Sequence, residues 1–151
     1  TKSFQTNKNF QKGNFVAKQK NSELLVKIDE IKKISDLKTK KILDARSFAR
    51  FSGQGKEPRP GLKPGHIPNS LNLPTTNLIS SKGFLIDIDH FTNILFKMNV
   101  NNNESLVATC GSGVSACVIA LIFYCSGNEK ISIYDGSWTE WASKGYPINK
   151  I

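Results

Sequence analysis

The sequence has few of the side chains that build metal sites or disulfide frameworks. Its 151 residues include only three cysteines and two histidines, and no Cys-x-x-Cys pair occurs. A zinc site needs several such ligands at short spacing, so we expect no metal. An odd number of cysteines in a chain of this size also argues against a disulfide framework. We therefore expect a reducing compartment.

Long hydrophobic runs are missing as well. The apolar run at 116–125 is ten residues long, about half of the ~20 that a membrane-spanning helix needs. The first residues lack the apolar core of a signal peptide and the arginines of a transit peptide. We therefore expect no membrane association and a cytoplasmic location, with a mitochondrial one as the alternative. Because the chain begins with Thr1, we expect a fragment or a processed product.

Arginine is scarce although the chain is basic. The net charge is +9, and only three of the 21 basic residues are arginine. Most of the excess charge lies in residues 1–41, where a lysine-rich flank could meet nucleic acid or an acidic surface. The lysines are scattered, however, and few aromatic residues interleave with them. This pattern favours a solvated surface, so we expect no nucleic-acid partner.

The length and the apolar content indicate one globular domain over 1–151. Within it we expect a linker or N-terminal extension at 1–14 and the core at 15–146. The segment 52–68 holds four glycines and four prolines, which predicts a long ordered loop or a lid.

The remaining elements alternate between strands and helices. Strands are expected at 15–16, 41–46, 70–73, 105–109 and 131–134. Helices are expected at 22–33, with Ser22 as a cap, and at 91–98, 116–124 and 137–145. This alternation predicts an α/β fold with βαβ units and a central parallel sheet.

One cysteine lies at the end of a strand. In a parallel sheet ligands gather at the carboxyl ends of the strands, here marked by Asp44, Cys110 and Asp135. Cys110 also precedes a glycine loop that opens a helix, where amide N–H groups and the helix dipole favour negative charge. A thiolate there is stabilised and nucleophilic. Cys117 and Cys125 lie in the apolar run that follows, where free cysteine is usually a core residue.

Two other devices share this loop pattern. Gly111, Gly113 and Ala116 match a dinucleotide fingerprint, and Asp135 follows the next strand. Against that interpretation, too few residues remain after Asp135 for further strands of a nucleotide-binding half. A cysteine phosphatase loop needs an arginine six positions after the cysteine to hold phosphate. Position 116 is alanine, so that interpretation fails.

The stretch CGSGVSA (110–116) resembles the active-site loop, CG[ST]GVT, of the 3-mercaptopyruvate sulfurtransferase branch of the rhodanese superfamily. Three further stretches agree in the family's order: 44–51, 57–74 and 134–141. The resemblance implies a rhodanese-like three-layer domain with about five central strands, similar to the second, catalytic domain of a two-domain enzyme. Ser115 stands where threonine is usual. Gly111 stands where thiosulfate-preferring relatives carry a basic residue.

The resemblance also implies the site. Cys110 would be the catalytic nucleophile, and the substrate-binding residues would be Arg50, Arg59, Gly111, Ser112, Gly113, Val114 and Ser115. The two arginines would hold the carboxylate and carbonyl of mercaptopyruvate, which suits guanidinium chemistry, since the loop carries no cationic side chain. We interpret Arg46 as a structural ion-pair former and Asp44 as a residue that orients the edge of the sheet.

The implied activity is transfer of sulfane sulfur from 3-mercaptopyruvate, or less well from thiosulfate. The sulfur would pass through a Cys110 persulfide to thiol or cyanide acceptors, with release of pyruvate and no cofactor. The implied partners are a small anionic sulfur donor, thioredoxin or a small-thiol acceptor, and an N-terminal rhodanese domain whose Asp–His pair would meet Ser112. We expect His66 to be structural. The alternatives are a non-catalytic persulfide carrier or binding module, and a thiosulfate sulfurtransferase.

Overall fold

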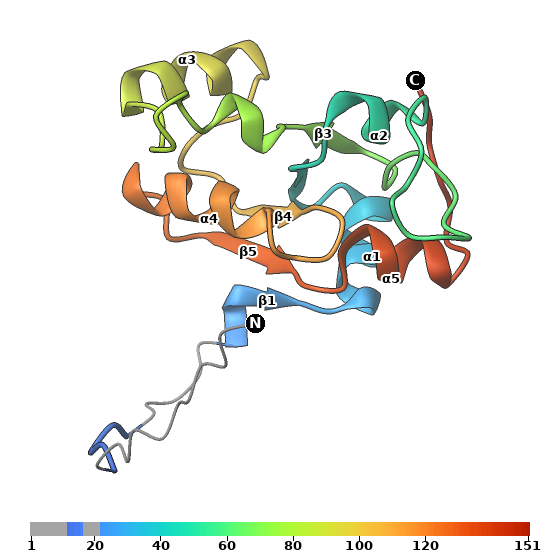
Figure 1. Ribbon diagram of the computed structural model, residues 1–151, viewed down its shortest axis with the longest axis horizontal. Helices are drawn as coiled ribbons and strands as arrows, with labels where there is room; N and C mark the ends of the chain where they lie inside the picture. Colours follow the sequence, from blue (N-terminus) through green and yellow to red (C-terminus); the bar gives the residue numbers. More distant parts are fainter. Residues whose placement is uncertain (1–11, 17–21) are drawn as a thin grey trace, which may run out of the picture.

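The computed structural model describes residues 12–16 and 22–151 and centres on one sheet (Figure 1). Five parallel strands are arranged in the order β1-β5-β4-β2-β3. The strands are β1 (Leu25–Val26), β2 (Lys41–Asp44), β3 (Ser70–Asn72), β4 (Leu106–Thr109) and β5 (Ile131–Tyr134). The predicted α/β fold with a five-stranded parallel sheet is confirmed.

Helices cover both faces of this sheet. They are α1 (Ile28–Leu37), α2 (Phe48–Ser52), α3 (Ile88–Lys97), α4 (Ala116–Cys125) and α5 (Ser137–Ser143), with short 3-10 turns η1 (Ser22–Leu24) and η2 (Thr75–Asn77). One core cluster joins the sheet to α3 and α4, and a second joins it to α1 and α5. The domain therefore has three layers. None of the described helices is long and apolar enough to cross a membrane.

The central strand β4 is buried on both faces. Leu106 and Ala108 belong to the cluster with α3 and α4, whereas Val107 belongs to the cluster with α1 and α5. A strand covered on both faces reads as a continuous apolar run, as LVAT does. Its carboxyl end therefore delivers Cys110 to a fixed place at the edge of the sheet.

Helix α4 is free of charged residues, yet only one face of it is buried. Ile119 and Ile122 lie in the core at 0% exposure, whereas Leu121 is 52% exposed. Cys117 and Cys125 are both exposed, so the expectation that they lie in the core is wrong. Because the whole run is apolar, the sequence does not show which face of the helix is buried. The helical period of about 3.6 residues per turn places these two cysteines on the outer face.

The N-terminal elements also differ from the prediction. The helix expected over 22–33 begins only at Ile28, after Lys27, whose N–H donates to Glu30 at 2.8 Å. The residues before it form η1 and the edge strand β1. No strand occurs at Phe15–Val16, where the side chains are 90% and 82% exposed. Residues 1–11 of the expected extension lie outside the described residues.

The segment between α2 and β3 is the expected ordered loop, without a helix or strand. It is tied to the C-terminal residues by paired hydrogen bonds between His66 and Asn149, of 2.9 and 3.0 Å. The Ile151 N–H also donates to Ser52 at 3.0 Å. The folded unit thus continues beyond residue 146, the boundary expected from the sequence.

Candidate active site

Cys110 lies directly after β4, and residues 110–115 form the loop that leads into α4. We call residues 110–115 the cysteine loop. Cys110 is 2% exposed, while Ser112 and Val114 on the outer side of the loop are exposed. In Figure 1 this loop lies at the end of the sheet from which α5 also starts.

Ser137, the first residue of α5, fixes the base of the cysteine loop. Its side chain is fully buried, and its backbone adopts a left-handed φ of 51°. The Oγ accepts the N–H of Cys110 at 3.1 Å and the N–H of Gly113 at 2.9 Å, and donates to Tyr134 O at 2.8 Å. It also lies 4.0 Å from Cys110 Sγ. Sequence reasoning missed Ser137, because its role depends on contacts between residues 24 and 27 positions apart.

Several amides of the cysteine loop remain available to a ligand. Four N–H groups of the cysteine loop donate to no other described residue, namely those of Gly111, Ser112, Val114 and Ser115. They precede the amino end of α4, where the helix dipole adds to their positive potential. The loop can therefore bind negative charge without a cationic side chain of its own.

Gly113 gives the loop its shape. Its φ is +84°, and a Cβ there would lie 2.7 Å from Asp135 Oδ1 and 2.9 Å from Asp135 O. Only glycine adopts this conformation at low cost and leaves room for the end of β5. The sequence placed Asp135 at this edge of the sheet, and the structure brings it against the loop.

Both predicted arginines reach the first glycine of the loop. Arg50, on α2, places Nη2 2.9 Å from the position that a Cβ on Gly111 would occupy. Arg59, in the segment after α2, donates from Nη1 to Gly111 O at 3.5 Å and also to Thr139 Oγ1. The structure therefore brings Arg50, Arg59 and the cysteine loop together.

A buried ionic network supports one of these arginines. Arg46 pairs with Asp44 at 2.6 Å, as expected for a structural ion pair, and its guanidinium lies 4.4 Å from the Trp138 ring centroid. Glu57 accepts from Arg46 at 2.9 Å and from Arg50 at 2.6 Å. Sequence reasoning missed Glu57, because no local pattern marks a carboxylate in an irregular segment as buried.

His66 is held inside the fold by contacts of its own. Its ring stacks on Phe51 with 3.9 Å between centroids, and Nδ1 lies 2.8 Å from Phe51 O. Burial lowers the pKa of His66, so the neutral form is favoured. These contacts agree with a structural histidine. Among the described residues, no group of three or more His, Cys, Asp or Glu side chains could hold a metal ion.

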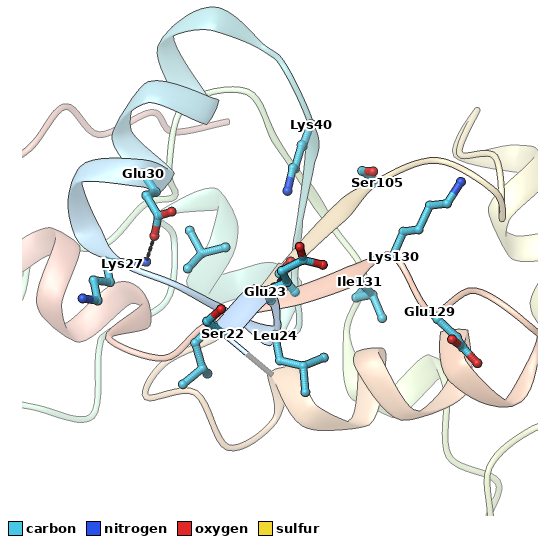
Figure 2. Close-up of a pocket in the computed structure, with 13 residues that line it drawn as sticks. Ser22, Glu23, Leu24, Lys27, Glu30, Lys40, Ser105, Glu129, Lys130 and Ile131 are labelled. Carbon is cyan, nitrogen blue, oxygen red and sulfur yellow. Dashed lines mark hydrogen bonds between the residues drawn. The ribbon is translucent and has the colours of Figure 1, made fainter. Parts of the chain in front are cut away.

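A pocket of about 820 Å³ lies at the other end of the sheet (Figure 2). Its lining includes Ser105 and Lys130, which directly precede β4 and β5, together with Lys40 before β2. Cys110 follows the carboxyl end of β4. The pocket is therefore separated from the cysteine loop by the length of the central strands and is not part of the candidate site.

Comparison with known proteins identifies the family. The model of the rhodanese-like domain matches residues 27–144. The chain belongs to the rhodanese family. This rhodanese domain is 39% identical to human 3-mercaptopyruvate sulfurtransferase over 123 residues, which are 82% of this chain and 41% of the human protein.

Two further relatives also match most of this chain over less than half of their own length. Thiosulfate sulfurtransferase of Gallus gallus is 36% identical over 110 residues, 73% of this chain and 37% of that protein. The crystal structure of SseA from Escherichia coli, a 3-mercaptopyruvate sulfotransferase, superimposes with a TM-score of 0.66 at 36% identity, covering 78% of this chain and 43% of SseA. The chain thus spans about two fifths of the length of these relatives.

Proposed function

We propose that this rhodanese domain is a sulfurtransferase that takes sulfur from 3-mercaptopyruvate, and less well from thiosulfate, through a persulfide on Cys110. The observation that carries the proposal is the cysteine loop, in which a thiol at the end of a central strand adjoins four available N–H groups. The names of the human and chicken relatives support sulfur transfer from these donors.

In the first step, the Cys110 thiolate attacks the sulfur of 3-mercaptopyruvate. A sulfur–sulfur bond forms as the carbon–sulfur bond of the donor breaks, and the donor's thiol proton ends on the methyl carbon of pyruvate. The cysteine loop N–H groups stabilise the negative charge on sulfur during the transfer. An acceptor thiolate or cyanide then attacks the outer sulfur and restores the Cys110 thiolate. No metal or organic cofactor takes part.

The arginines provide the recognition of the donor. Arg59 is exposed and reaches the carbonyl of Gly111, and Arg50 approaches the same glycine from α2. Guanidinium groups hold carboxylates well through paired N–H donors. A donor with its carboxylate on these arginines would present its sulfur to Cys110 at the base of the loop.

The partners proposed for this domain follow from its exposed loop and its length. Ser112 is exposed on the cysteine loop, where an Asp–His pair from an N-terminal rhodanese domain would meet it. The relatives are long enough to hold such a domain. Thioredoxin or small thiols would accept the sulfur. A reduced Cys110 requires a reducing compartment, the cytoplasm or the mitochondrion.

The test is release of pyruvate from 3-mercaptopyruvate by this chain, combined with mass spectrometry of the cysteines. We expect added sulfur on Cys110 and its loss in Cys110→Ser. The matched control is Cys117→Ser, because Cys117 is an exposed cysteine in the first turn of α4. We expect Cys117→Ser to keep activity. Added sulfur on Cys117 with none on Cys110 would contradict the proposal, whereas a persulfide on Cys110 without turnover would favour the carrier alternative.

A further inference from the structure

Glu57 is a buried carboxylate held between two arginines. Its side chain is 2% exposed, and Oε1 accepts from Arg46 Nη1 at 2.9 Å and from Arg50 Nε at 3.1 Å. Oε2 accepts from Arg50 Nη2 at 2.6 Å, so the contact with Arg50 is two-pronged. Such a pair fixes the plane of a guanidinium as well as its position. Arg50 is therefore held in place by Glu57.

The same guanidinium nitrogen connects Glu57 to the cysteine loop. Arg50 Nη2 lies 2.6 Å from Glu57 Oε2 and 2.9 Å from the position of a Cβ on Gly111, so the carboxylate is within about 5.5 Å of that position. Its negative charge thus acts on the cysteine loop almost as directly as the positive charge of Arg50. Arg59, in contrast, has no carboxylate partner among the described residues. Its side chain donates hydrogen bonds there only to Gly111 O and Thr139 Oγ1.

We infer that Glu57 is a positioning residue that sets the charge preference of the donor site. It aims the Arg50 guanidinium at the loop while offsetting its charge, and it thereby favours a monocarboxylate donor over a dianion such as thiosulfate. This inference rests on the proposed function and assigns the selectivity of the same site. Asp135, on the Gly113 side of the loop, contributes a charge that the variants below leave unchanged.

The expected shift in donor preference does not depend on the total charge of the site. Removing the charge of Glu57 changes the potential at the loop by one fixed amount, and a ligand responds in proportion to its own charge. A dianion therefore gains twice as much as a monoanion. If the Glu57 carboxylate and the bound donor are about 10 Å apart and partly screened by solvent, we expect the ratio of the two donor efficiencies to shift roughly 3- to 15-fold toward thiosulfate.

The principal variant is Glu57→Gln, which removes the charge and keeps the shape and one acceptor oxygen. The ratio of kcat/KM for thiosulfate to that for 3-mercaptopyruvate is measured, with kcat and KM separated for each donor. The matched control is Glu104→Gln, since Glu104 pairs with Lys41 at 2.8 Å near the starts of β4 and β2. Glu57→Asp keeps the charge and should restore the wild-type ratio.

A second comparison holds the Arg50 contact constant. Arg50→Gln alone removes a guanidinium that the donor's carboxylate would contact, so it is used only as the reference. The double variant Arg50→Gln/Glu57→Gln should have a higher ratio than Arg50→Gln, because only the Glu57 charge differs between the two. This pair of variants keeps the inference testable if Glu57→Gln alone does not fold. Calorimetric binding of sulfate and pyruvate, a dianion and a monoanion, measures the same preference without turnover.

The inference is supported if Glu57→Gln raises the ratio at least threefold through KM, Glu104→Gln does not, and the double variant has a higher ratio than Arg50→Gln. Equal losses for both donors in Glu57→Gln, or the same ratio in Arg50→Gln and the double variant, would overturn it, because a purely structural role affects both donors alike. If wild type forms no Cys110 persulfide with either donor, the proposed function fails. The sulfate and pyruvate affinities of the variants then still decide the charge preference.

Discussion

Ser137→Ala is expected to loosen the cysteine loop without altering its surface. The substitution removes only Oγ, and alanine meets the same φ of 51° as serine does, so backbone strain is not changed. It leaves the N–H groups of Cys110 and Gly113 without the acceptor they now share at 3.1 and 2.9 Å. An unsatisfied buried donor costs about 1–3 kcal/mol, so the two together should cost about 2–6 kcal/mol.

The assay combines urea denaturation with the rate at which iodoacetamide alkylates Cys110. We expect the free energy of unfolding to fall by the full amount of about 2–6 kcal/mol if both donors stay buried. If the loop opens and water reaches both donors, we expect a smaller loss together with faster alkylation of Cys110. Ser143→Ala is the control, because Ser143 lies on the same helix and is exposed, and among the described residues its hydroxyl donates only to Thr139 O at 2.6 Å. Its effect should stay within about 0.5 kcal/mol. If Ser137→Ala matches this control in both measurements, Ser137 does not hold the loop.

Two other changes probe the loop and the histidine. Gly113→Ala combines a φ of +84° with a Cβ 2.7 Å from Asp135 Oδ1, so persulfide formation should be lost. The control is Gly61→Ala, which has a φ of +80° and no described atom within 4 Å of its Cβ, and which should lower only the unfolding midpoint. Equal effects of the two variants would show that the contact with Asp135 is unimportant. Burial lowers the pKa of His66 below the ordinary 6.5 in the folded state. The unfolded chain therefore binds the proton first, and stability falls as the pH drops below about 6.5, by at most ~1.4 kcal/mol per pH unit. His66→Gln should flatten the unfolding free energy between pH 7 and 5, and an unchanged slope would assign the acid sensitivity to other groups.

The regular elements were largely predictable because they depend on short-range patterns. The strands at 41–44, 70–72, 106–109 and 131–134 follow from short apolar runs between turn residues. The loop after β4 follows from the small residues that separate two such runs. Cys110 could then be placed at the carboxyl edge of the sheet by topology alone.

The errors arose where neighbours along the chain do not decide the outcome. Leu24 and Leu25 fit a helical spacing, yet pairing with β5 places Leu25 in the edge strand. Cys117 lies in an apolar run, yet the core covers only the opposite face of α4. Both outcomes depend on which surface of the sheet remains to be covered, and that is a tertiary property.

The two loop glycines show why the site could be located from the sequence but not explained by it. Gly113 is required by its left-handed backbone, whereas Gly111 is not; a side chain at 111 would instead meet Arg50 Nη2 at 2.9 Å. That nitrogen is not free to move aside, because Glu57 binds it at 2.6 Å. A basic residue after the cysteine and an arginine on α2 in its present position therefore compete for the same space beside the nucleophile. Positive charge can reach Cys110 by one route or the other, so Gly111, Arg50 and Glu57 determine donor preference only as a set.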